Sequence, residues 1–444
     1  MNADMKIEVM WISPFQGTPE VARTSAEIQI RFGLENAMRF EDDWSQSVQQ
    51  RARVSAYPLA LWFASSWWRV RWEPLPSRIR LRLSSNAMEA DSDWRMSHEI
   101  SAAGYGFIWP RLAFASDGEA IWVKCWQSSP LSSEPVRYLS DFEASISSRE
   151  FEHEIDHFVD LVLRRLDGSG QTELQTLWRQ VLAERADPEQ SAARRIEARL
   201  GYEPDDAPVS LMQRLLELTT QAGPGATDEI APVCAGSDPG AALREVLDLS
   251  LKPGVNGKIS VDRNLRSHDG EMPPWQRGRQ SARHLRRELG LLDGPITDDA
   301  LAAILEIPRK HLECPSHESD NAPIGLAIRG DNLRDVKLLF RKRNRPARRF
   351  EAARFVADYL FADLREKWLP LTDAATARQK VQRAFAAEFL CPIESLRFRL
   401  GDEFLPEAFD EAADYFGISE RAVRSHLANH GLIPRSLVDV ETMT

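Results

Sequence analysis

The chain of 444 residues contains little cysteine and no long apolar run. Its four cysteines are scattered and form no Cys-x-x-Cys pair, which argues against a cysteine zinc site and is typical of a reducing compartment. No run of about 18 apolar residues occurs, so we expect no membrane contact. The first residues lack the basic start and apolar core of a secretory signal, so we expect a cytoplasmic protein.

The chain also lacks an excess of positive charge. Its net charge is −11, with 43% apolar and 28% charged residues, which is ordinary for a globular protein with sizeable cores. A protein with this charge contacts nucleic acid only through a local basic patch. We expect no cofactor.

The segment 1–145 is predicted to be a β-rich domain. Ser25–Phe32 (SAEIQIRF), Trp67–Trp72 (WWRVRW) and Ala120–Trp126 (AIWVKCW) alternate in the manner of strands. Ten of the 13 tryptophans precede residue 127, which makes this domain rich in Trp. Trp beside Arg could stack on bases, but alternation alone predicts a sheet with Trp in the core and Arg facing solvent.

The rest of the chain is predicted to be mainly helical. Segment 146–240 reads as a helical domain that ends in a linker rich in Gly, Pro and Asp at 222–240. Segment 241–444 forms the last unit, where Pro323–Phe340 predicts two short strands around a turn at Gly330-Asp331-Asn332. The expected fold class is therefore α+β and multidomain.

The stretch His153-Glu154-Ile155-Asp156-His157 spells the zinc-peptidase pattern HExxH. Two histidines four apart on a helix can hold Zn²⁺, and the glutamate can act as general base. A third ligand is not obvious downstream, where Glu173 is the candidate. The sequence around the motif predicts one apolar stripe, which leaves both histidines on the opposite, solvent face. That stripe consists of Phe151, Ile155, Phe158, Val159, Val162 and Leu166.

Two later segments resemble the ImmA/IrrE-type zinc metallopeptidase family. They are RRFEAARFVADYLF at 348–361 and KVQRAFAAEFLCPIESLR at 380–397. The lead-in at 274–305 and the tail, EAADYFGISERAVRSHLANHGLI, are also similar to the family. The resemblance covers roughly residues 270–435. It implies a mostly α, zincin-like domain and a bacterial stress-response, toxin–antitoxin or phage-defence setting.

The family's chemistry is missing from this sequence. The two histidine positions correspond to Arg354 and Asp358, the catalytic glutamate to Phe355, and the third ligand to Val381. Arginine stays protonated and does not ligate zinc, and phenylalanine accepts no proton from water. The resemblance therefore implies a pseudopeptidase with no catalytic residue and no metal. We expect the motif helix to pack centrally and Arg354 to pair with Asp358 across one turn.

Two features further along could contact nucleic acid or an acidic partner surface. The basic run RKRNRPARR spans 341–349, and a helix-turn-helix-like segment spans 407–431. Ser419 is a predicted N-cap and Gly431 a predicted C-terminal stop. Acidic residues on the first helix of the segment oppose DNA binding, so the favoured interpretation is packing of the tail onto the body or contact with a partner. The candidate contact residues are Arg341, Lys342, Arg343, Arg345, Arg348, Arg349, Arg421 and Arg424.

Three functional hypotheses remain open on the sequence. The first is a non-catalytic regulatory protein that binds a protein partner encoded nearby. The second is a DNA- or RNA-binding regulator that uses the basic run and the tail. The third is a zinc peptidase that uses the HEIDH motif at 153–157.

Overall fold

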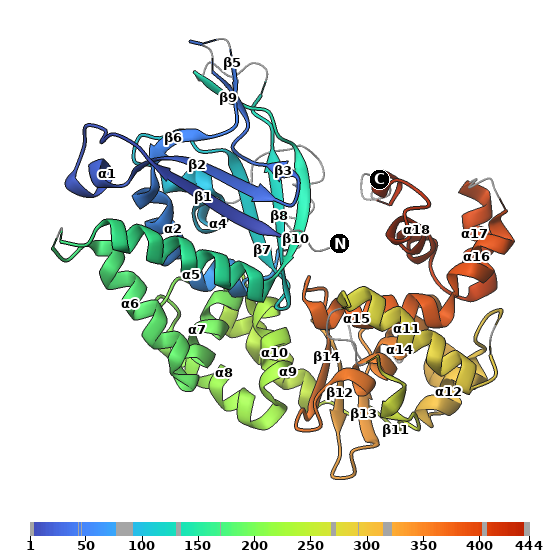
Figure 1. Ribbon diagram of the computed structural model, residues 1–444. Helices are drawn as coiled ribbons and strands as arrows, with labels where there is room; N and C mark the ends of the chain where they lie inside the picture. The colour runs from blue at the N-terminus through green and yellow to red at the C-terminus, as the bar shows by residue number, and fades with distance from the viewer. Residues whose placement is uncertain are drawn as a thin grey trace. The chain divides into compact units, whose positions relative to one another are not determined.

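The computed structural model describes residues 4–438 except 43, 46, 77–91, 130–134, 169, 268–271, 292, 314–321 and 402–405. The protein is α+β, as predicted, and divides into two compact units, Met1–Gln213 and Arg214–Thr444 (Figure 1). Within the described residues, no helix combines the length and the apolar character needed to cross a membrane.

The described residues of the first unit form three small antiparallel sheets. In these sheets β2 pairs with β1, β3 and β6, β8 lies between β7 and β10, and β4 lies between β5 and β9. Strands β2 and β8 occupy the residues predicted for them. The strands are β1 (Met5–Trp11), β2 (Ser25–Phe32), β3 (Glu35–Asn36), β4 (Phe40–Asp42), β5 (Ser47–Gln49), β6 (Ala52–Ser55), β7 (Arg111–Ser116), β8 (Ala120–Trp126), β9 (Val136–Tyr138) and β10 (Phe142–Ser147).

Helices complete this unit. They are α1 (Pro19–Arg23), α2 (Ala56–Trp72), α4 (Ser92–His98), α5 (Ser148–Arg165), α6 (Glu173–Ala186) and α7 (Pro188–Leu200), with α8 (Val209–Ala222) crossing into the second unit. Apolar residues of α5, α6 and α7 belong to the same core as the sheets and α2. Three of the helices expected in a separate middle domain, α5, α6 and α7, therefore share the core of the N-terminal unit.

The prediction of a strand at Trp67–Trp72 is wrong, because these residues form the last turns of helix α2. This helix is apolar on nearly every face and is buried along almost its whole length. A helix that is apolar all round is typical of a protein core. Its arginines do not face solvent. Arg69 pairs with Glu73 at 2.7 Å, and Arg71 pairs with Glu152 at 2.5 Å.

The second unit is built on one antiparallel sheet in the order β11-β13-β12-β14. The predicted strand pair is confirmed as β12 and β13, which pair from Leu326–Leu339 to Arg329–Val336. The stretch 222–240, predicted to be a linker, instead contains helix α9, with Pro224 in its first turn. The strands are β11 (Val255–Lys258), β12 (Gly325–Arg329), β13 (Asp335–Leu339) and β14 (Trp368–Leu371).

Helices α11, α14 and α15 gather beside this sheet (Figure 1). Helix α14 is buried over most of its length, which confirms the central packing predicted for the motif helix. Helices α11 and α15 cross so closely that a Cβ on Gly278 would clash with the carbonyl oxygen of Val381. The helices are α9 (Pro224–Cys234), α10 (Pro239–Leu251), α11 (Pro274–Glu288), α12 (Asp298–Leu305), α13 (Lys310–Glu313), α14 (Arg345–Phe361), α15 (Ala377–Leu390) and α16 (Ile393–Leu400).

The tail forms the two helices predicted for it, α17 (Pro406–Phe416) and α18 (Glu420–Asn429). Gly417 turns the chain between them with φ of +64°. The hydroxyl of Ser419 accepts a hydrogen bond from the amide of Ala422, so the predicted N-cap is confirmed. Gly431 follows the second helix with φ of +70°, the left-handed conformation expected of a helix stop.

Candidate functional site at helix α14

Arg354 lies in the middle of helix α14 with its side chain almost fully buried. Its Nη2 donates to the carbonyl oxygen of Thr372 at 2.8 Å and to the side-chain oxygens of Gln379 and Gln382, the second at 3.1 Å. Burial of the cation lowers its pKa to about 10, which still leaves the guanidinium charged at neutral pH. A permanent cation therefore lies among neutral oxygen acceptors in the interior.

The two glutamines that surround Arg354 come from the first half of helix α15. Gln379 also accepts from the backbone amide of Thr372 at 3.0 Å. Both glutamines donate to the carbonyl oxygen of Pro370, at 3.0 Å from Gln379 and 3.3 Å from Gln382. The hydrogen bonds of Arg354 Nη2 and of the two glutamines join α14, α15 and the end of β14 in one buried polar network.

Asp358 lies one turn along α14 and is fully buried. Arg378 of α15 forms two parallel hydrogen bonds to it, Nε to Oδ1 at 2.7 Å and Nη2 to Oδ2 at 2.8 Å. Burial alone would lower the pKa of Arg378, but the adjacent Asp358 carboxylate outweighs that effect and raises it. This fork-to-fork pair fixes the N-terminal turn of α15 against α14.

The predicted pairing of Arg354 with Asp358 is wrong. Each side chain takes its partners from α15 or from the residue after β14, and no ion pair joins the two among the described contacts. The spacing of four residues allowed a pair on an isolated helix. In the folded unit, Arg378 forms two hydrogen bonds with Asp358, whereas Arg354 hydrogen-bonds with other residues.

The other two positions of the family pattern carry apolar side chains in the core. Phe355 is fully buried, and its ring meets that of Phe340 edge-to-face with centroids 5.5 Å apart. Val381 is also buried. The structure therefore places all four predicted positions in the interior of the second unit, two in polar networks and two in apolar packing.

The basic run 341–349 is largely engaged inside the protein. Arg341 forms a bidentate pair with Asp373, at 2.8 Å and 3.0 Å. Arg345 and the buried Arg349 both pair with Asp298. The guanidinium carbon of Arg348, also a buried side chain, lies 4.9 Å from the centre of the Phe340 ring. Lys342 and Arg343 are exposed.

The helix-turn-helix-like tail presents a mixed surface. Arg421 is exposed, whereas Arg424 is half-buried and pairs with Glu420, its Nε lying 2.9 Å from the carboxylate. The carboxylates of the first helix face solvent, and they would repel a phosphate backbone placed beside them. These exposed acidic residues are Glu407, Asp410, Glu411 and Asp414.

The HEIDH motif lies on helix α5 with both of its histidines, His153 and His157, exposed. The apolar stripe predicted on the opposite face is confirmed, since all six of its side chains are fully buried. Glu154, the residue that would act as general base, accepts a hydrogen bond from the amide of Ile7 at 2.6 Å. Asp156 forms a bidentate pair with Arg185. The polar residues between the histidines therefore serve the fold of the first unit.

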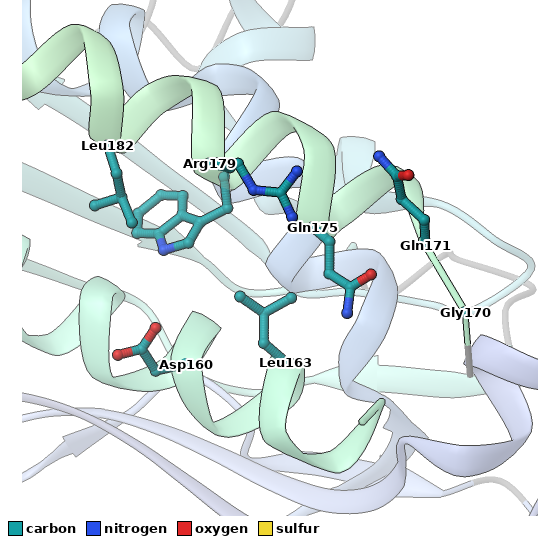
Figure 2. Close-up of a pocket in the computed structure, with 8 residues that line it drawn as sticks. Asp160, Leu163, Gly170, Gln171, Gln175, Arg179 and Leu182 are labelled. Carbon is teal, nitrogen blue, oxygen red and sulfur yellow. The ribbon is translucent and has the colours of Figure 1, made fainter. Parts of the chain in front are cut away.

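A pocket of about 510 Å³ lies between α5 and α6 of the same unit. Figure 2 shows Asp160 and Leu163 of α5 facing Gln175 and Arg179 of α6, with Gln171 at one end. Its lining mixes amide, carboxylate, guanidinium and apolar groups. No general acid–base pair or nucleophile with an adjacent base is present in this lining.

A further polar cluster escaped the sequence analysis. Glu388 of α15 and His426 of α18 are buried, His430 caps α18, and one ligand-capable atom from each lies within 4.8 Å of the others. Despite the cost of burial, the neighbouring His426 and Arg283 lower the pKa of Glu388 to about 2. Burial lowers the pKa of His430 to about 4. The spacing of the two histidines, four apart in HLANH, was the available signal.

Comparisons with protein-family models, with curated proteins and with solved structures yield no match to this chain.

Proposed function

We propose that the chain is a non-catalytic regulatory protein that binds a protein partner through a unit built on a degenerate peptidase-like framework. The observation that carries this proposal is the buried guanidinium of Arg354 at the centre of helix α14, with three oxygen acceptors around it. A cation supplied by the protein itself lies where the resemblance would require a metal ligand.

The chemistry of this centre opposes hydrolysis. A hydrolytic zinc site needs ligands with lone pairs, an open position for water and a base to activate that water. Arg354 has no lone pair to give, Phe355 has no basic atom, and Asp358 already accepts two hydrogen bonds from Arg378. A metal ion would also compete with the guanidinium for the oxygens of Gln379 and Gln382.

The partner that fits this proposal is a protein encoded nearby, in a bacterial stress-response, toxin–antitoxin or phage-defence module. This setting rests on the family resemblance. One surface position offers a first test of where the partner binds. Phe398 of α16 is 92% exposed, and aromatic side chains are enriched among the residues that dominate binding energy at interfaces.

The experiment is co-expression of the full chain with the product of each neighbouring gene, followed by size-exclusion chromatography. We expect a stable complex with one of them that persists in a metal chelator, because binding in this proposal needs no catalytic metal. Phe398→Ser should weaken the complex, whereas Leu364→Ser, which alters a half-exposed side chain, is the matched control. Failure of every neighbour to form a complex would contradict the proposal.

A nucleic-acid-binding regulator is the second candidate, favoured by the exposed side chains of Lys342 and Arg421. Each phosphate that a protein neutralises releases counterions, so affinity for DNA or RNA would fall steeply as salt rises. The double variant Lys342→Ala, Arg421→Ala should flatten that dependence without disturbing the core. Absence of binding at low salt would remove this candidate.

A further inference from the structure

Glu388, His426 and His430 meet where the C-terminal helix α18 packs against α15. The side chains of Glu388 and His426 are 2% and 3% exposed, and His430 is half-buried. His426 Nε2 lies 3.5 Å from Glu388 Oε2, too far for a well-formed hydrogen bond. The two imidazole rings lie 4.9 Å apart, nearly perpendicular.

Three polar atoms in this cluster are buried without a hydrogen bond. They are Glu388 Oε2, His426 Nε2 and His430 Nε2. Buried polar atoms nearly always have a hydrogen-bond partner, so three exceptions within one cluster of ligand-capable side chains need a physical reason. A cation bound between them would satisfy all three at once.

We propose that Glu388, His426 and His430 bind a divalent transition-metal ion, with Zn²⁺ the best fit. Two histidines four apart on one helix share a face, and a carboxylate from a second helix supplies the third ligand. Imidazole and carboxylate ligands suit Zn²⁺, and water would complete a tetrahedral site. This set shares no residue with HEIDH or with the four positions of the family pattern.

The surroundings orient the carboxylate. Arg283 of α11 donates its Nε–H to Glu388 Oε1 at 2.7 Å, which holds one oxygen, while Oε2 lies 3.5 Å from His426 Nε2. Such partners of a ligand fix its orientation. Arg279 donates to the carbonyl oxygen of Asn429 at 3.0 Å and fixes the end of α18. Both arginines are positive, so they favour the carboxylate while opposing a cation, and the site should bind a metal less tightly than one without them.

The role of the metal would be structural. Glu388 lies on the body of the unit and both histidines lie at the end of the tail, so one ion would fasten α18 to α15. The burial of two ligands leaves little access for a substrate. This inference is independent of the proposed function, because a partner-binding protein can fold with or without a structural metal ion.

The test is metal analysis of the full chain, followed by titration of chelator-treated protein with Zn²⁺. We expect about one saturable site per chain and a rise in melting temperature on adding Zn²⁺, since a ligand of the folded state stabilises it. His430→Gln should lose the metal and weaken binding at least tenfold. The double variant His153→Ala, His157→Ala, which removes both HEIDH histidines, should bind as the parent does.

Because His430 is half-buried, its replacement should leave the fold intact, and the circular-dichroism spectrum of the metal-free variant should match that of the metal-free parent. Glu388→Gln keeps the shape of the side chain and provides a second variant. The proposal is overturned if the parent shows no saturable binding, if His430→Gln and Glu388→Gln bind as the parent does, or if the HEIDH double variant loses the metal.

Discussion

Arg349 of helix α14 donates its Nε–H to the carbonyl oxygen of Gly417, 2.9 Å away, in the turn of the helix-turn-helix-like tail. The same guanidinium pairs with the buried Asp298 at the start of α12. One side chain from the basic run thus joins three segments of the second unit. The tail therefore packs onto the body, which is one of the two interpretations that the sequence favoured.

Loss of that guanidinium should be costly. Arg349→Met leaves Asp298 buried with only Arg345 beside it, and removing one partner of a buried pair costs about 3–5 kcal/mol. We expect the lower end of that range because Arg345 remains. Chemical denaturation measures the change, with the exposed Lys342→Met as control, expected to stay within about 0.5 kcal/mol of the parent. Equal changes in the free energy of unfolding for Arg349→Met and Lys342→Met would show that the basic run 341–349 is a solvated loop.

Gly417 and Gly431 form a matched pair of left-handed glycines. A Cβ at Gly417 would lie 2.9 Å from Arg349 Nε, whereas one at Gly431 meets nothing within 4 Å. Gly431→Ala should cost about 1–2 kcal/mol for the backbone conformation alone. Gly417→Ala should cost at least about 1 kcal/mol more, because Arg349 must move. Thermal or chemical unfolding measures both, and equal losses would contradict the contact.

Double-mutant cycles should show which arginine interacts energetically with Asp358. We expect Asp358→Ala and Arg378→Ala to show an interaction energy of about 1–3 kcal/mol, because the two form a buried bidentate pair. The cycle of Asp358→Ala with Arg354→Ala should give a clearly smaller value, since those two share no hydrogen bond. A larger coupling to Arg354 would restore the pairing that the sequence predicted.

Stability should fall in acid through Asp298. Its burial tends to raise the pKa, but Arg345 and Arg349 outweigh that effect and hold the pKa of Asp298 below its ordinary 3.8. A carboxyl group with a depressed folded-state pKa adds stability above the unfolded value, and this stability is lost as pH falls through the folded value. The free energy of unfolding should therefore drop below about pH 4. Asp298→Asn should show a shallower drop, and an unchanged acid profile would count against this pair.

Much of the second unit could be predicted from short-range patterns. The two strands around Gly330-Asp331-Asn332, the capped tail helices and the buried motif helix follow from alternation, turn residues and caps. In the first unit, the same patterns gave a wrong prediction at Trp67–Trp72. An alternating run six residues long also fits the end of a helix that is apolar all round, and the N-cap at Ser55 lay too far upstream to decide between them.

The polar sites depended on contacts between distant segments. Asp358 could have paired with Arg354 by spacing alone, and only the fold brings Arg378 to it. Glu388 and the two histidines of the tail lie on different helices, so no local pattern contains all three. Local patterns predict which residues are on a helix, but not which charged side chain of another helix they will meet.

The central claim is that the unit around Arg354 binds a partner without cutting it. The most direct measurement is mass spectrometry of the bound partner after incubation with the zinc-loaded full chain, beside Glu388→Gln and the double variant His153→Ala, His157→Ala. We predict that the partner keeps its intact mass in every sample, because Arg354 and Phe355 supply neither a ligand nor a base. Zinc-dependent cleavage by the parent chain would contradict the account, and the variant that abolished it would identify the true active site.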